Sequence, residues 1–284
     1  MRFGFHLSIG GGPSKAIEEG VELGCETMQI FSRNPRGWKA KPLAPEDAGL
    51  AERARERGIE PVVVHMPYLP NLASPDQAMY QRSLDALIEE IRRCSFLGVP
   101  YLVTHLGKRK DAPLEVGIER VIGALKAALE KTADDSSNVM VLLENTAGQG
   151  SEVGTSLEEL AEILEDVGYP ERVGICFDTA HAFEAGMPIH TKEGLEQTLE
   201  EFDRLIGLEK LRVIHLNDSK TPFGSHVDRH WHIGEGEMGL EAFRNIIGHP
   251  AFWGLPAIME TPGKGELDKK NMATVLRLRE EVSP

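Results

Sequence analysis

Six apolar runs of the sequence end at, or next to, a side chain that can bind a metal ion. The intervals between these side chains are 34 to 45 residues, as expected for one residue per repeated strand–helix unit. Imidazole and carboxylate donors without cysteine suit zinc, and also manganese or iron. The six residues are His65, His105, Glu144, Asp178, His215 and Glu260.

Three further donors lie close to this set in the sequence. His181 follows Asp178 by three residues, and Asp228 and His230 form an Asp-x-His pair in the segment VDRHWHIGEG. Alternate residues of an extended segment point the same way, so this pair could face one ion. Nine donors exceed the needs of one tetrahedral ion, and two or three ions are expected. His6, near the end of the first run, is expected to orient a ligand.

A single histidine or aspartate at a strand end usually has a structural role, such as capping the next helix. A set of six is different. Gathered at one place without compensation, these groups would cost several kcal/mol through desolvation and like-charge repulsion. Bound cations remove both costs, so the set predicts a metal cluster.

The elements that must position these residues are eight short runs rich in Val, Ile, Leu and Phe. Each has the length of one buried strand, and the chain length gives about 35 residues per unit, near the minimum for a strand–helix unit. Helical spacing separates the runs, for example over 80–97, 114–131 and 156–167. The runs are 3–8, 27–31, 61–65, 100–105, 139–144, 173–178, 212–216 and 256–260.

These runs predict an α/β fold, a TIM (β/α)8 barrel over residues 1–284 as one domain. In such a barrel the strand ends converge at the C-terminal mouth, where barrel enzymes keep their active sites. Ser156 and Glu159 have the spacing of a helix capping box. The alternative is an open doubly wound sheet. It is disfavoured because the run Gly10–Gly12 lacks the GxGxxG spacing.

Composition narrows the class of protein. The chain is 27% charged and 41% hydrophobic, which is ordinary for a globular protein. It has no apolar run near the roughly 20 residues of a membrane span, and its start, MRFGFHLSIG, lacks the pattern of a signal peptide. Cys25, Cys94 and Cys176 give neither a disulfide framework nor a CxxC site. We expect a cytoplasmic protein with no membrane partner.

Four segments resemble the endonuclease IV family of zinc-dependent abasic-site DNA repair enzymes. They are LLENTAGQG (142–150), FDTAHAFEAG (177–186), HLNDSK (215–220) and FGSHVDRHWHIGEG (223–236). The resemblance extends from HLSIGGG (6–12) to METPG (259–263). It implies a TIM barrel that hydrolyses the phosphodiester 5′ to an abasic site in double-stranded DNA, leaving a 3′-hydroxyl and a 5′-deoxyribose phosphate. It also implies trimming of blocked 3′ ends and a monomeric enzyme.

The resemblance further implies three zinc ions per chain, with substitution by Mn²⁺ or Fe²⁺ left open. His65, His105 and Glu144 would hold the first ion. Glu144 would bridge to the second ion and orient the hydroxide nucleophile, which makes it the expected catalytic residue. The remaining ligands would be Asp178, His215 and Glu260 for the second ion, and His181, Asp228 and His230 for the third.

DNA contacts are implied for two loops that follow the second and third strands. Arg36 in SRNPRGW (32–38), with Tyr68 and Leu69 in HMPYLPN (65–71), match the residues that enter the minor groove and fill the gap at the lesion. An abasic nucleotide is the easiest to flip, because no base pair must be broken. The alternative for Tyr68 and Leu69 is packing onto the barrel rim.

Two positions depart from the family pattern. Leu106 follows His105 where many relatives have Pro, and a bulky Trp231 follows His230. Neither puts a ligand in doubt. The basic run after Leu106 is expected to compensate with phosphate contacts, which Arg229 would share. The run is Lys108, Arg109 and Lys110.

The net charge of −14 argues at first against a nucleic-acid partner, because phosphate affinity comes from Lys and Arg. Basic residues nevertheless follow the strand ends, whereas the expected outer helix at 157–166 carries five acids and no base. We therefore expect an acidic back and a basic, metal-loaded face that steers DNA. The basic residues are Arg33, Arg36, Lys39, Lys41, Lys108, Arg109, Lys110, Lys220, Arg229 and Lys264.

Two other functions compete with the nuclease. A sugar isomerase or epimerase could use Glu144, Asp178, His215 and Glu260 around one or two divalent metals, but the five additional donors are unnecessary for proton transfer. A non-catalytic, zinc-stabilised DNA-binding module is the third possibility. Structural zinc sites are usually closed and rich in cysteine, which this set is not.

Overall fold

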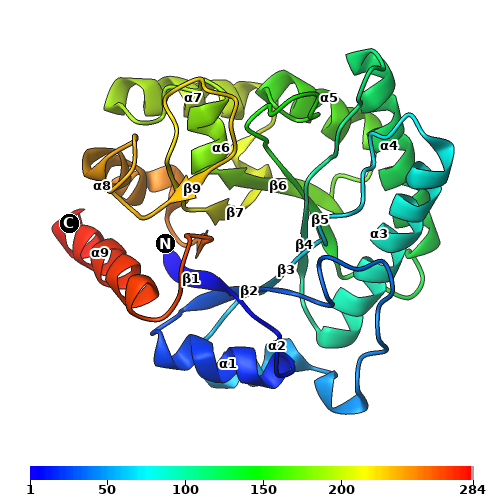
Figure 1. Cartoon of the computed structure of the whole chain (residues 1–284), viewed down its shortest axis with the longest axis horizontal. Coiled ribbons are helices and arrows are strands. Elements are labelled where there is room, and N and C mark those ends of the chain that lie inside the picture. The colour runs from blue at the N-terminus through cyan, green and yellow to red at the C-terminus, as the bar shows by residue number, and fades with distance from the viewer. Residues whose placement is uncertain (283–284) are drawn as a thin grey trace.

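Eight parallel strands close into a barrel in the computed structural model, which describes residues 1–282 (Figure 1). Each strand pairs with the next along the chain, and the last strand closes the barrel against the first. The predicted TIM barrel is confirmed. The strands are β1 (Arg2–Leu7), β2 (Thr27–Phe31), β3 (Val62–His65), β4 (Tyr101–Thr104), β5 (Met140–Glu144), β6 (Val173–Asp178), β7 (Leu211–His215) and β10 (Pro256–Met259).

Helices surround the strands as an outer ring (Figure 1). In α5, Leu157, Leu160 and Ile163 are buried, while four of the five acids of the predicted acidic helix are exposed. The helices are α1 (Pro13–Glu22), α2 (Leu50–Glu56), α3 (Gln77–Leu97), α4 (Leu114–Lys131), α5 (Leu157–Val167), α6 (Thr179–Glu184), α7 (Lys192–Leu205), α8 (Leu240–Gly248) and α9 (Glu266–Val282), with short 3-10 turns at Pro45–Asp47, Leu208–Lys210 and Pro250–Phe252.

The capping box predicted for α5 forms only in part. The Ser156 hydroxyl accepts a hydrogen bond from the Glu159 amide at 3.3 Å, as expected. The Glu159 carboxylate instead accepts from the amides of Gly154 and Thr155. The side chain therefore fastens the preceding loop to the helix.

An apolar layer fills the inside of the barrel. Its six members are buried and come from six of the strands. Each lies two residues before one of the six strand-end donors, and residues two apart on a strand point the same way. The barrel therefore carries the donors directly above this layer, at the C-terminal mouth. The layer is Val63, Val103, Leu142, Cys176, Val213 and Ile258.

A small antiparallel hairpin after β7 pairs β8 (Asp218–Ser219) with β9 (His230–Trp231). The buried Asp218 carboxylate accepts hydrogen bonds from the amides of Gly234, Gly236 and Met238, which fixes the segment after β9. The hairpin places His230 beside the barrel mouth. No helix within residues 1–282 is both long and apolar enough to cross a membrane.

Candidate metal centre

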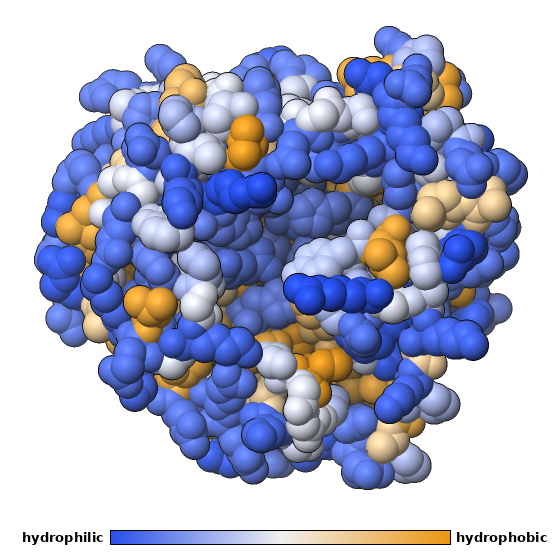
Figure 2. All heavy atoms as spheres, viewed as in Figure 1, coloured by the Kyte–Doolittle hydropathy of each residue, from blue (hydrophilic) through white to orange (hydrophobic). Residues whose placement is uncertain are grey.

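The nine predicted donors converge at the C-terminal mouth, although they span nearly 200 residues of sequence. Eight of them fall into three groups, and within each group the ligand atoms lie within 4.8 Å of one another. Several line a cavity of about 880 Å³ that is open to the surface. Figure 2 shows this face hollowed at its centre, with mainly hydrophilic residues in the hollow. The groups are His65, His105 and Glu144; Glu144, Asp178, His215 and Glu260; and Asp178, His181 and His230.

Glu144 belongs to two of these groups and divides its oxygens between them. Oε2 lies 3.1 Å from His65 Nε2 and 3.3 Å from His105 Nε2. Oε1 lies 2.8 Å from His215 Nδ1. A carboxylate that directs each oxygen to a different set of donors has the arrangement of a bridging ligand.

Asp178 is shared in a similar way and is also a helix cap. Its Oδ1 accepts the His181 amide at 2.8 Å, which begins α6, and its Oδ2 lies 3.5 Å from His230 Nε2. Asp178 therefore caps a helix, the structural role considered for a strand-end aspartate, and also belongs to the donor set. Asp228 is the ninth donor and lies beside this group, with its Oδ1 3.4 Å from His181 Nε2 and 3.7 Å from His230 Nε2.

The hydrogen bonds of three histidines fix which ring nitrogen faces the centre. His65 Nδ1 lies 2.7 Å from the Met66 carbonyl oxygen, and His181 Nδ1 lies 2.9 Å from the carbonyl oxygen of Asn145. His215 Nε2 lies 2.9 Å from the amide oxygen of Gln29. Carbonyl oxygens only accept, so in each neutral ring the proton occupies that outer nitrogen. The inner nitrogen then presents a lone pair, as a metal ligand requires.

The ionisable groups of the centre strongly shift one another's pKa values. Burial would raise the pKa of Glu144, but His105 and His215 hold it well below its usual range. Burial lowers the pKa of His181, yet Asp178 and Asp228 raise it well above the ordinary value. Without cations, protons on buried histidines balance the carboxylates.

The donor set fits divalent cations. Inner-facing lone pairs of imidazole nitrogens meet carboxylate oxygens at 2.8 to 3.3 Å at His215 and His65, which is repulsive unless a proton or cation lies between them. The donors are nitrogen and oxygen only, a set that zinc and related ions accept. The four-residue group proposed for a sugar isomerase is present, but it is embedded in the larger set.

Polar residues that support the donors were missed by the sequence analysis. Gln29 on β2 donates from Nε2 to Glu260 Oε1 at 2.8 Å while it accepts from His215. Asn217 donates to Asp178 Oδ2 at 2.8 Å, and its Oδ1 accepts the Glu260 amide at 2.7 Å. An amide inside the apolar run TMQIF was a signal that could have identified Gln29.

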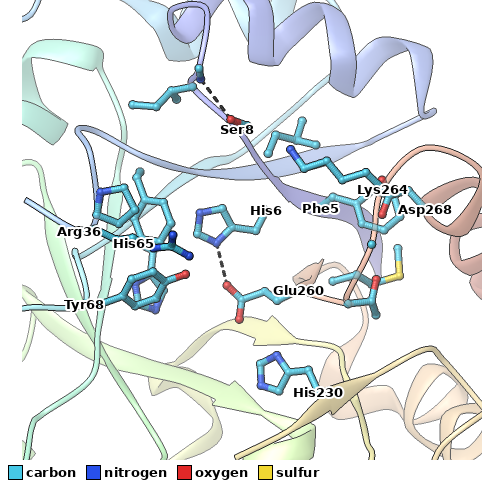
Figure 3. A pocket seen from close by; sticks show the side chains of 18 of the residues that line it. Phe5, His6, Ser8, Arg36, His65, Tyr68, His230, Glu260, Lys264 and Asp268 are labelled. Carbon is cyan, nitrogen blue, oxygen red and sulfur yellow. Dashed lines mark hydrogen bonds and ion pairs between the residues drawn. The ribbon is translucent and has the colours of Figure 1, made fainter.

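His6 has the orienting contact expected from its position. Its Nδ1 lies 2.8 Å from Glu260 Oε1 (Figure 3). His6 and Gln29 therefore hold Oε1 of Glu260, which leaves Oε2 directed at the donor group at 3.3 Å from His215 Nδ1.

The three residues expected to contact DNA lie at the rim. Arg36 is exposed, and Tyr68 is 63% exposed with its ring edge-on to Phe31 at 5.2 Å. Figure 3 shows Arg36 and Tyr68 together beside His65. Leu69 is half-buried and lines a second cavity of about 380 Å³, which Tyr68 also lines.

The expected basic face has fewer free cations than the sequence predicted. Arg33 is buried and paired with Glu90, with Arg33 Nε and Glu90 Oε1 2.7 Å apart, so it offers no charge to a ligand. Lys108 pairs with Glu152 at 3.2 Å, and the Arg109 guanidinium donates to the Ala112 carbonyl in its own loop. Lys264 lines the larger cavity, and Lys110 lines the second cavity described above. Arg229 is exposed.

The two unusual residues have structural explanations. Leu106 is fully buried, where it packs against the turn at Gly154. Trp231 lies beneath the Lys220 ammonium, which sits 4.2 Å from the ring centroid. This cation–π contact stabilises the hairpin that carries His230, and the Lys220 charge is directed at the ring.

Comparisons with known proteins agree with this geometry. A family model described as "Xylose isomerase-like TIM barrel" matches residues 17–280. Two curated relatives, each named "Probable endonuclease 4", are from Methanoculleus marisnigri (51% identical; 97% of this chain and 98% of the relative covered) and Methanosphaerula palustris (50%; 98% of each). The crystal structure of endonuclease IV from Thermus thermophilus is 34% identical, covers 99% of this chain and 100% of its own, and has a TM-score of 0.86.

Proposed function

Since the chain belongs to the endonuclease IV family, we propose that it is a metal-dependent DNA repair hydrolase that cuts the phosphodiester 5′ to abasic sites in double-stranded DNA. The products would be a 3′-hydroxyl and a 5′-deoxyribose phosphate, and blocked 3′ ends would also be trimmed. The observation that carries the proposal is the sharing of Glu144 and Asp178 between donor groups beside an open cavity.

Three zinc ions are proposed as the resident metals, with Mn²⁺ or Fe²⁺ as substitutes. When bound, they would supply stabilisation of the negative charge that grows on the phosphate and activation of a water near neutral pH. His65, His105 and Glu144 would hold one ion. Glu144 would be shared with the second ion, whose other ligands would be Asp178, His215 and Glu260, and the third would have His181, Asp228 and His230.

The protein's own contribution is a rigid set of ligands with one accessible side. Glu144 is fully buried and held between three histidines, so its two oxygens keep separate directions. His105 and Asp228 have side chains that are 39% and 43% exposed. A scissile phosphate would therefore approach from their side, where the cavity opens.

Selection of the lesion is proposed to rest on the rim. Arg36 and the exposed ring of Tyr68 would replace lost stacking when the duplex is kinked, and Leu69 would extend the apolar wedge. Lys110, Arg229 and Lys264 would contact phosphates. Lys108 and Arg109 are left out of this set, because Lys108 pairs with Glu152 and the Arg109 guanidinium folds onto its own loop.

We further propose that the enzyme acts as a monomer in the cytoplasm. All three cysteines are buried and free, a state that a reducing compartment maintains.

The decisive assay uses a duplex with one tetrahydrofuran abasic analogue and a matched undamaged duplex. Zinc-loaded protein is expected to cut only the strand with the analogue, on its 5′ side, and to leave an end that a polymerase extends. An intact strand, or a cut on the 3′ side, would disprove the proposed function. Ketose epimerisation by the same preparation would favour the sugar-epimerase alternative.

A further inference from the structure

Charged side chains are buried together between helix α3 and the loop that follows β2. Glu90 is fully buried, Arg33 is 4% exposed and Arg93 is 8% exposed. Glu90 lies 2.7 Å from Arg33 Nε and accepts the Ser32 hydroxyl at 2.6 Å. Arg93 Nε in turn donates to Ser32 Oγ at 2.7 Å.

Hydrogen bonds from this network hold the loop segment 32–41 at both ends. Arg93 donates to the carbonyl of Ser32 at the start of the segment and, at 3.0 Å, to the carbonyl of Lys41 at its end. The middle is held as well. Arg33 donates to the Trp38 carbonyl at 3.2 Å, and the Arg82 guanidinium lies 4.2 Å from the centroid of the Trp38 ring.

The segment 32–41 also supports the neighbouring loop. The Tyr68 amide donates to the carbonyl of Pro35 at 3.2 Å, and Phe31, just before the segment, contacts the Tyr68 ring. Arg36 projects from the same segment, with its amide bonded to Asn34 Oδ1. Helix α3 therefore holds the segment that carries Arg36. Through that segment it also supports the loop that carries Tyr68.

We propose that Arg93, Arg33 and Glu90 are positioning residues that hold segment 32–41 in the shape that presents Arg36 and Tyr68 to a DNA lesion; this rests on the proposed function. Burying three charges is costly, and an apolar contact would stabilise a loop as well. Only a directional network sets both ends of the segment relative to the helix. A loop ordered in advance loses less conformational entropy when DNA binds.

The effect should therefore appear in DNA binding rather than in the chemical step. No residue of the network is among the nine metal donors, and Arg33 is the only one that lines the large cavity. Disturbing the network is expected to raise KM and the Kd for damaged duplex, while kcat and metal content stay close to those of the wild type.

The test compares R93K with the matched variant R92K. Lysine keeps the charge but cannot reach the three acceptors that Arg93 bonds. Arg92 is its neighbour on α3 but bonds Asp135 and Lys131, away from the loop. Amide hydrogen exchange over 32–41 is measured without DNA, together with Kd for tetrahydrofuran duplex, kcat and zinc content.

R93K is expected to speed exchange in segment 32–41 and to raise Kd and KM about tenfold, with kcat within about twofold of wild type. R92K should match the wild type. Unchanged exchange in R93K, faster exchange with unchanged Kd, or an equal effect in R92K would overturn the proposal.

A second variant covers failure of R93K to fold. S32A removes the hydroxyl that joins Glu90 to Arg93 and leaves the three buried charges in place. Faster exchange with weaker binding in S32A would support the proposal, and wild-type values for both would overturn it. If the wild-type protein itself does not prefer the tetrahydrofuran duplex, the proposed function fails, whatever the exchange data show.

Discussion

The Nε2 atoms of His181 and His230 lie 3.3 Å apart, although one residue is on helix α6 and the other on the hairpin strand β9. His181 is held by the Asn145 carbonyl through its other nitrogen. Two imidazole nitrogens directed at one point favour a shared cation, and Asp228 Oδ1 lies within 3.7 Å of both. The third proposed site is thus where the hairpin loop meets the barrel.

This relationship predicts a selective loss of metal. D228N should lower zinc from three ions per chain to two, because a neutral amide is a weaker ligand than a carboxylate. The matched variant is R229A, which changes the next residue and should keep three ions while it weakens DNA binding. Elemental analysis after dialysis measures the metal content. Three ions in D228N would remove Asp228 from the ligand set.

Loss of the shared carboxylate should be more severe. E144Q is expected to lower kcat on tetrahydrofuran duplex by about 10²-fold or more, because charge stabilisation at the reacting phosphate is disturbed. Its circular dichroism should stay native. E130Q, on the outer helix α4, is the control for the same chemical change and should be fully active. Full activity of E144Q would exclude Glu144 from the mechanism.

Zinc binding should release protons at neutral pH. Burial opposes charge on His215 and His181, but neighbouring groups raise the pKa of each well above its ordinary value in the metal-free protein. Protons held on these two rings must leave when metal binds, whereas the pKa of the Glu144 carboxyl is lowered and favours its ionised form. Affinity should therefore rise as the pH is raised above 6.5, the ordinary pKa of histidine. Calorimetry in buffers of different ionisation enthalpy measures the exchange, and proton uptake would contradict the expectation.

Gln29 should matter for metal affinity although it is not a proposed ligand. Q29L removes the amide that orients Glu260 and His215, and loss of such support typically weakens metal binding about 10- to 100-fold. Competition with a chelator of known affinity gives the value. Q81L, at an exposed site on α3, is the control. Equal affinities in the two variants would show that Gln29 does not orient the ligands.

Tyr68 should matter for DNA and not for zinc. Y68A is expected to weaken binding to tetrahydrofuran duplex about tenfold through lost stacking, with three zinc ions retained. Tyr169, which is 37% exposed and lies before the start of β6, provides the control variant Y169A. If Y68A instead loses zinc, the ring would have a structural role at the rim.

The barrel and the convergence of the donors followed from the sequence because both depend on strand periodicity. Each strand-end donor lies two residues beyond an inward-facing apolar residue, as Leu142 and Glu144 show, so one alternation sets the core and the site together. Gln29 was not predicted, because its partners come from strands far away in the sequence.

The ion pair of Arg33 could not be predicted from the sequence. Its position after a strand suggested a free cation on the DNA-facing side. Its buried partner Glu90 lies 57 residues later on α3, and only the tertiary structure reveals that the two charges neutralise each other. The face therefore carries fewer free cations than its composition indicated. Its positive charge would depend more on the proposed metal ions.

The most direct measurement is anomalous diffraction from zinc-loaded crystals, recorded on both sides of the zinc absorption edge. We predict three peaks at the C-terminal mouth, two of them in contact with Glu144 and the third among His181, Asp228 and His230. A single peak, or peaks that leave Glu144 without a metal contact, would contradict the proposed three-ion centre.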